Sequence, residues 1–245
     1  MQPIQKTARF AGAMYLFSAI AVGVPLIYVP TVLVVSGNAT ATANRVLAHE
    51  TLFRGCMLSE LVGAIAFLFM VRALYRLLFS VSERQASLMV MLVLISLPMT
   101  FLNVLNEIAS LTLLQGATFL SVFGEAQRNA LAMFFLGLHA DGANLTNIFW
   151  GLWLFPFGVL VWRSGFIPRV LGAWLVLNGV ALVTVSLTAL FLPAELNIVN
   201  RLATLPELGE LWIMAWLLIV GVKTPIPSSD GIANPADRSR ETGMS

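Results

Sequence analysis

The sequence predicts an all-α fold, a polytopic integral membrane protein with six transmembrane helices and both termini in the cytoplasm. Composition is the first reason, because 58% of the 245 residues are hydrophobic and only 11% are charged, against about 25% charged in soluble domains. The mean hydropathy, +0.87, points the same way. The third reason is that apolar runs long enough to cross about 30 Å of hydrocarbon recur along the chain.

Six such runs define the expected spans. The first, 10–35, follows a short polar leader with Lys6 and Arg9, and it is too long for the apolar core of a secretory signal. The fourth is centred on 144–162, after a partly embedded helix over 130–142. The remaining spans are expected at 52–79, 86–114, 168–192 and 205–222.

Orientation follows from the Lys and Arg residues on alternate sides of these spans. One side carries Arg45, Arg54, Arg128 and Arg201. The other side carries Lys6, Arg9, Arg72, Arg76, Arg84, Arg163, Arg169, Lys223, Arg238 and Arg240. Since basic loops stay inside, the richer side and both termini are expected in the cytoplasm, in a multi-pass protein of the plasma (inner) membrane.

The domain organisation is expected to be simple. Residues 1–222 would form a single six-helix transmembrane domain, in which no repeat of fixed period is visible. Residues 223–245 are rich in Pro, Ser and charge and are expected to form a disordered cytoplasmic tail.

Composition and motifs exclude several classes of function. The net charge is +2, but the basic residues lie at the ends of apolar runs, so membrane lipids and no nucleic acid are expected as partners. The single cysteine, Cys56, excludes an internal disulfide and a multi-cysteine metal site. No glycine-rich phosphate loop, Gly-x-Ser-x-Gly or His-Glu-x-x-His pattern occurs, and no cofactor is expected.

A dense polar cluster begins the fourth span. Within nine residues it contains His139, Asp141, Asn144 and Asn147. Polar and ionisable groups are costly inside a membrane, so this cluster is a candidate site. His139 and Asp141 are two residues apart and would point to different sides of a helix, which argues against a catalytic dyad.

Three carboxylates also fall within the expected spans. Glu60 lies six residues beyond Arg54, roughly 9 Å inward at 1.5 Å per residue. Glu107 lies about as far into the third span, and Glu210 slightly less far into the sixth. With the orientation given above, all three occupy the outer half of the bilayer, which suggests one cavity open to the outside or to the outer leaflet.

Helical spacing places many of these polar residues on shared faces. A polar stripe that recurs every three or four residues along the third span, and is therefore expected to face inward, comprises Ser96, Thr100, Asn103, Glu107 and Ser110, with Asn106 beside it. On the fourth span a seven-residue repeat comprises Gly137, Asn144, Gly151 and Gly158. Such a line of small residues allows a neighbouring helix to approach closely.

The sixth span is expected to begin at a capping box. Thr204 and Glu207 have the required spacing, and Pro206 suits the first turn of a helix. Glu207 would then be a cap, whereas Glu210, one turn deeper, would be a site residue.

Several short motifs together carry a family resemblance. They are Leu52-Phe53-Arg54-Gly55, Leu138-His139 with Gly142, Arg163-Ser164-Gly165 with Pro168-Arg169, Leu171-Gly172, Gly209-Glu210, Trp216-Leu217-Leu218 and Gly221-Val222-Lys223. From Arg9 to Lys223 the chain resembles a family of bacterial membrane proteins known as domain of unknown function 4386. The resemblance implies a small polytopic helical protein and supplies no activity.

The chain departs from that family pattern at two positions. Relatives often carry a second histidine where this chain has Trp153, and a shorter aspartate where it has Glu60. The first departure argues against a histidine-based metal or haem site, so no metal is expected.

Two functions and one structural interpretation remain open. The first function is an outward-facing pocket for a small amphipathic or lipid-like ligand, with proton coupling through His139 and the carboxylates. The second is an intramembrane enzyme that performs acid–base chemistry on a lipid or isoprenoid. The structural interpretation is a bundle without a ligand, held together by interhelical hydrogen bonds worth about 0.6 kcal/mol each.

Ten residues are expected to bind the ligand of the first hypothesis, and no residue is assigned a catalytic role. They are Arg54, Glu60, Asn103, Asn106, Glu107, His139, Asn144, Asn147, Trp150 and Glu210. Asn144 is the sharpest candidate, because it lies on the glycine line and is expected to face the carboxylates of other spans.

Overall fold

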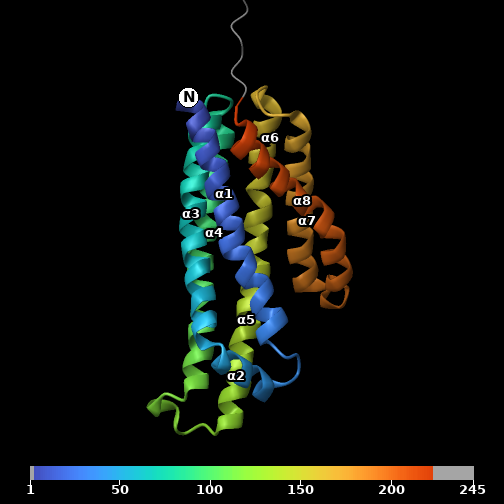
Figure 1. Ribbon diagram of the computed structural model, residues 1–245. Helices are drawn as coiled ribbons and strands as arrows, with labels where there is room; N and C mark the ends of the chain where they lie inside the picture. The colour runs from blue at the N-terminus through green and yellow to red at the C-terminus, as the bar shows by residue number, and fades with distance from the viewer. Residues whose placement is uncertain (1–2, 223–245) are drawn as a thin grey trace, which may run out of the picture.

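The computed structural model describes residues 3–222, and in that part of the chain every regular element is a helix. Six of its helices or helix pairs are long and apolar enough to cross a membrane, which confirms the predicted fold class. The long helices run side by side along one axis (Figure 1). A hairpin of α7 and α8 stops short of the end at which the small helix α2 lies (Figure 1).

The element bounds are as follows. They are α1 Pro3–Tyr28 with a π turn Val29–Leu33, α2 Ala39–Ala48, α3 Glu50–Leu78, α4 Glu83–Gln115, α5 Glu125–Leu152, α6 Leu154–Ser164, α7 Arg169–Phe191 and α8 Leu196–Ala215 with a π turn Trp216–Val220. Short 3₁₀ turns at Thr118–Leu120 and Pro193–Glu195 lie in the connections before α5 and α8.

The fourth span is a broken helix. The predicted lead-in over 130–142 is continuous with the span, because α5 extends without interruption to Leu152. The break falls at Trp153, three residues before Pro156. A proline has no amide hydrogen to donate to the carbonyl four residues back, here that of Leu152, and therefore interrupts the helix at this point.

The predicted start of the sixth span is wrong. Helix α8 begins at Leu196, so Pro206 lies inside it, and the Thr204 hydroxyl donates to the carbonyl of Asn200 at 3.1 Å instead of capping a helix. The capping-box spacing and Pro206 indicated a helix start here, but a proline inside a helix removes only one internal hydrogen bond, which the packed bundle tolerates. Glu207 is consequently free of a capping role.

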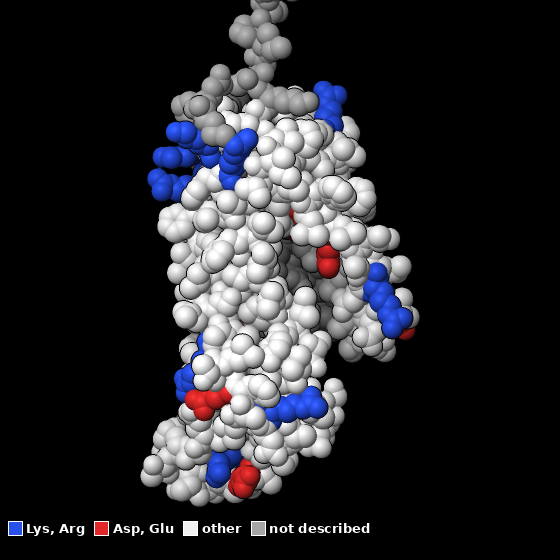
Figure 2. Space-filling model, viewed as in Figure 1, with Lys and Arg blue, Asp and Glu red and all other residues white. Residues whose placement is uncertain are grey.

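Both described ends of the chain lie at the same end of the bundle (Figure 1). The Gln5 side chain donates to the carbonyl of Val220 at 2.7 Å and accepts from the amide of Val222 at 2.9 Å. Basic side chains gather at this end, here called the basic end (Figure 2). Its cytoplasmic location stays a prediction, and the tail expected over 223–245 lies outside the described residues.

Two apolar cores fill the bundle. The basic-end core is formed by α1, α3, α4, α6, α7 and α8 with its π turn, around residues such as Leu74, Phe157 and Leu217. The α2-end core packs α2 onto α3, α4 and α5 around residues such as Val46 and Phe53. The polar groups described below lie between these cores and at the inner edge of the second.

Glycines set the distance between the fourth and fifth spans. A Cβ built on Gly151 would lie 2.7 Å from the Gly179 carbonyl oxygen, and one built on Gly158 would lie 2.6 Å from that of Gly172. The predicted glycine line is therefore a helix contact at these two positions. At Gly137, by contrast, a Cβ would meet nothing within 4 Å.

We expect Gly151→Ala to destabilise the bundle by about 1–3 kcal/mol, because the added methyl group forces α5 away from α7. The measurement is the unfolding free energy in mixed micelles titrated with a denaturing detergent. Gly137→Ala is the matched control on the same helix and should leave stability unchanged or slightly improved, since alanine favours helix and open space surrounds the site. Equal losses for the two variants would contradict this account.

Candidate functional site

The structure divides most of the ten predicted residues between two places. Glu60, Glu107 and His139 meet in the bundle interior, with Asn103 and Asn106 beside them. Three others line a separate cavity, namely Asn147, Trp150 and Glu210. The sequence predicted a single shared site, whereas the structure has two separate sites.

The first site is a cluster of two carboxylates and a histidine from three helices. The His139 Nε2 atom of α5 lies 3.7 Å from Glu60 Oε1 of α3 and 4.0 Å from Glu107 Oε1 of α4. All three residues are buried: Glu60 is 2% exposed, Glu107 0% and His139 7%. We call this group the Glu60–Glu107–His139 cluster.

Asn103 fixes the histidine in this cluster. Its side-chain amide donates to the His139 carbonyl oxygen at 2.9 Å, and its own carbonyl oxygen lies 3.3 Å from His139 Nδ1. Since a carbonyl oxygen only accepts, Nδ1 carries the proton of this bond and Nε2 is the atom turned toward the carboxylates. Asn106 in turn donates to Asn103 Oδ1 at 3.1 Å, which orients the Asn103 amide.

The carboxylates of the cluster are poorly satisfied. Within residues 3–222, Glu60 Oε1 and both oxygens of Glu107 are buried without a hydrogen-bond partner. In the same part of the chain, His139 supplies the one basic group found within 4.0 Å of either carboxylate. Buried polar atoms normally have partners, so this arrangement requires a physical explanation.

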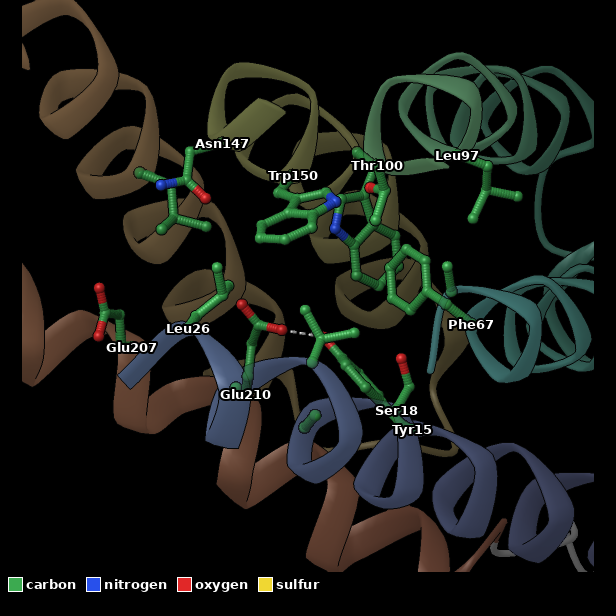
Figure 3. A pocket seen from close by; sticks show the side chains of 16 residues that line it. Tyr15, Ser18, Leu26, Phe67, Leu97, Thr100, Asn147, Trp150, Glu207 and Glu210 are labelled. Carbon is green, nitrogen blue, oxygen red and sulfur yellow. Dashed lines mark hydrogen bonds between the residues drawn. The ribbon is translucent and has the colours of Figure 1, made fainter. Parts of the chain in front are cut away.

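The second site is a cavity of about 360 Å³ between α1, α3, α4, α5, α7 and α8. Most of its wall is apolar or aromatic, including Phe67 and Trp150 (Figure 3). Its polar lining consists of Tyr15, Ser18, Thr100, Asn147, Glu207 and Glu210. The space-filling view shows a hollow in an otherwise uncharged surface beside α8, with acidic side chains at its edge (Figure 2).

Glu210 is the best-anchored polar group of this cavity. The Tyr15 hydroxyl of α1 donates to one of its carboxylate oxygens (Figure 3). The Asn178 side chain of α7 donates to the other at 2.6 Å. Sequence reasoning missed Tyr15 and Asn178. Each is a polar side chain in the middle of an apolar span, and that signal was available.

Glu207 and Trp153 also line the cavity, although neither is among the ten predicted ligand-binding residues. Glu207 lies one turn before Glu210 on α8, which brings a second carboxylate to the same space. Trp153 is 2% exposed, stacks on Phe157 with ring centroids 5.2 Å apart, and meets Phe67 edge to face at 5.3 Å. It forms a wall between the cavity and the basic-end core.

Two predicted site residues belong to neither place. Arg54 is exposed and pairs with Glu50 at 2.8 Å. The carbonyl of Asn144 accepts a 2.6 Å hydrogen bond from Ser186 of α7, so this residue serves the contact between two helices. Asp141 is exposed whereas His139 is buried, which agrees with the spacing argument against a dyad.

The cluster and the cavity are neighbours along the bundle axis. On α5, eight residues separate His139 from Asn147, roughly 12 Å at 1.5 Å per residue. On α4, Thr100 lines the cavity and Asn103, one turn on, contacts His139. The polar stripe predicted for the third span therefore runs from one site to the other.

Gly142 leaves room for the Asn103 side chain, because a Cβ at this position would lie 2.1 Å from Asn103 Oδ1. We expect Gly142→Ala to displace Asn103 from its bonds and cost about 1–3 kcal/mol of unfolding free energy. In an Asn103→Ala background the obstacle is gone, so the same substitution should cost less than about 0.5 kcal/mol. Additive losses in this double-mutant cycle, measured by denaturing-detergent titration, would contradict the assigned contact.

Comparison with known proteins identifies a family. A family model described as Domain of unknown function (DUF4386) matches residues 10–221, which include all of the residues of both sites. No curated protein and no solved structure matches the chain. Together with the six apolar helices, the match establishes that this multi-pass membrane protein belongs to the family described as Domain of unknown function (DUF4386).

Proposed function

We propose that this protein binds a small amphipathic or lipid-like ligand in the cavity beside α8, with the polar end of the ligand at Glu210. The cavity volume of about 360 Å³ falls within the range of small-molecule sites, roughly 300–1,000 Å³. A wall that is mostly apolar, with a few convergent polar groups, is also typical of such sites. The single observation that carries the proposal is the Glu210 carboxylate, held in that wall by side chains from α1 and α7.

The lining specifies the chemistry of the polar end. Glu207 and Glu210 are its charged members, and none of the described lining residues is basic. Tyr15, Phe67 and Trp150 add aromatic rings, which attract cations. Acidic and aromatic groups together favour a ligand whose apolar body ends in an ammonium group or another strong hydrogen-bond donor.

The surroundings of the hollow favour entry from the bilayer. Large apolar side chains on the flanking helices are exposed, among them Ile20 and Val24 of α1 and Leu211 of α8. Such side chains suit contact with lipid tails, where an amphipathic ligand is already dissolved. Placement of the cavity in the outer half of the bilayer depends on the orientation predicted from the basic residues.

The geometry favours ligand binding over acid–base catalysis on the same ligand. A catalytic acid and base must both face the reacting molecule. Here the histidine and two of the three carboxylates predicted within the spans form the Glu60–Glu107–His139 cluster, outside the cavity wall. Glu210 is left with Glu207 as the ionisable pair that the ligand would meet.

The test is a calorimetric titration of octyltrimethylammonium into the protein in nanodiscs, with empty nanodiscs as the blank. We expect saturable binding. We expect Glu210→Gln to weaken it at least about tenfold, or ~1.4 kcal/mol, because the amide keeps the shape of the side chain but loses its charge. Glu125→Gln is the control, since Glu125 is an exposed carboxylate at the start of α5. Octyl sulfate, with the same chain and the opposite charge, should not saturate; equal affinity for both amphiphiles would refute the proposed chemistry.

We further propose that binding of the ligand is coupled to release of a proton from Glu210, which makes a separate prediction. If a cation displaces a proton from Glu210, the apparent binding enthalpy at one pH should differ between phosphate and Tris buffers, because the released proton is taken up by the buffer. The buffer dependence should vanish in Glu210→Gln. Identical enthalpies for the wild-type protein in the two buffers would mean that the cation binds without proton exchange.

A further inference from the structure

The Glu60–Glu107–His139 cluster has the donor atoms of a metal site. One oxygen from each carboxylate and one nitrogen of His139 lie within 4.8 Å of one another. A transition-metal ion holds such atoms at about 2.0–2.2 Å, which places any two ligand atoms roughly 3–4 Å apart. The distances of 3.7 and 4.0 Å from His139 Nε2 to the two carboxylates are already in that range.

The unpartnered oxygens are the second observation that points to a cation. Glu107 is 0% exposed, and neither of its carboxylate oxygens has a hydrogen-bond partner within residues 3–222. Glu60 Oε1 is also buried without a hydrogen-bond partner in this part of the chain, and it lies 3.7 Å from His139 Nε2. A carboxylate buried among apolar groups without partners is costly, and a bound cation would remove that cost.

The histidine is arranged as a metal ligand. Metal-binding histidines usually donate from one ring nitrogen to a carbonyl or carboxylate and coordinate the ion with the other. His139 Nδ1 lies 3.3 Å from the Asn103 carbonyl oxygen, and Nε2 faces Glu60 and Glu107. The Asn103 amide, bonded to the His139 carbonyl at 2.9 Å, fixes the two helices at this position.

The charges also balance. Two carboxylates and a neutral imidazole carry a charge of −2, which one divalent ion would neutralise. No lysine or arginine among the described residues does so, because the one basic group within 4.0 Å of the carboxylates is His139 itself. The α2-end core, with Cys56 and Met57 next to Glu60 along α3, closes the cluster in an apolar setting where an unbalanced charge is least tolerable.

We propose that Glu60, Glu107 and His139 bind a divalent first-row transition-metal ion, one that accepts imidazole nitrogen and carboxylate oxygen, such as Zn²⁺, Mn²⁺ or Fe²⁺. The ion joins α3, α4 and α5 at the inner edge of the α2-end core. Three protein ligands leave at least one coordination position for water or another small ligand. The expectation of no metal rested on counting cysteines and histidines, and it gave no weight to carboxylates brought together from two other helices.

The direct test is metal content. Protein purified in detergent is incubated with Zn²⁺, Mn²⁺ or Fe²⁺ in separate samples and passed over a desalting column. Elemental mass spectrometry should then find about one equivalent of at least one of these ions bound to the protein. His139→Gln and Glu107→Gln should retain less than about a tenth of that amount. Asp141→Asn, an exposed carboxylate two residues from His139, and Glu210→Gln, in the cavity, are matched controls and should keep it.

A stability measurement keeps the proposal testable if a variant folds poorly. The wild-type melting temperature should rise by roughly 5–10 °C when the ion is in hundredfold excess over its Kd, and Glu107→Gln should show no rise. In excess chelator, Glu107→Gln should be at least as stable as the wild type. The reason is that the substitution removes a buried charge, which has no partner once the ion is gone.

Two outcomes would overturn the proposal. One is wild-type protein that retains none of the three ions and gains no stability from any of them. The other is metal content that is unchanged by His139→Gln and Glu107→Gln, which would place the ion elsewhere. The metal site and the cavity beside α8 can fail independently. A protein that binds octyltrimethylammonium but no metal ion would overturn the metal site alone, and a protein that binds the ion but not the amphiphile would overturn the cavity proposal alone.

Discussion

Close contact between helix backbones is the constraint on which the rest of this bundle depends. Lipid tails are as apolar as leucine, so helices in a bilayer associate through packing and interhelical hydrogen bonds. Gly63 lets α1 approach α3, and the Ser18 and Ser59 hydroxyls then reach backbone carbonyls across that contact at 2.9 and 2.8 Å. Gly151 and Gly158 do the same for the pair of α5–α6 and α7, where Ser186 bonds to Asn144.

This packing determines where the costly polar groups end up. With α4 packed against both α3 and α5, Glu60, Glu107 and His139 are buried together beside the α2-end core. Helix α8 meets α1 and α7 differently. Tyr15 and Asn178 reach Glu210 from two sides, yet a cavity remains between the helices. The buried carboxylates of the first site are therefore suited to a small ion, and the cavity-lining carboxylates of the second to a larger molecule.

Much of the fold was predictable because the membrane imposes it. A span must be apolar over about 20 residues, so six apolar runs predicted six helices. The ends of those helices were less predictable, since a helix continues into the polar surroundings wherever its neighbours support it. Helix α1 begins at Pro3 and α8 at Leu196, both earlier than hydropathy indicated. Pro206 resembled a helix start, but in the structure it is an interior residue whose lost hydrogen bond the bundle tolerates.

The sequence by itself determined the class of the protein, the polar stripe of α4, the separation of His139 from Asp141 and the candidate status of every buried carboxylate. Each of these depends on composition or on the period of a single helix. Tertiary structure alone decided that the candidates form two sites, that Arg54 and Asn144 belong to neither, and that Tyr15, Asn178 and Glu207 join Glu210. The reason is that the helical period gives only the direction in which a side chain leaves its own helix. The residue that it contacts depends on which helix packs beside it, and on the rotation and depth of both helices in the bundle.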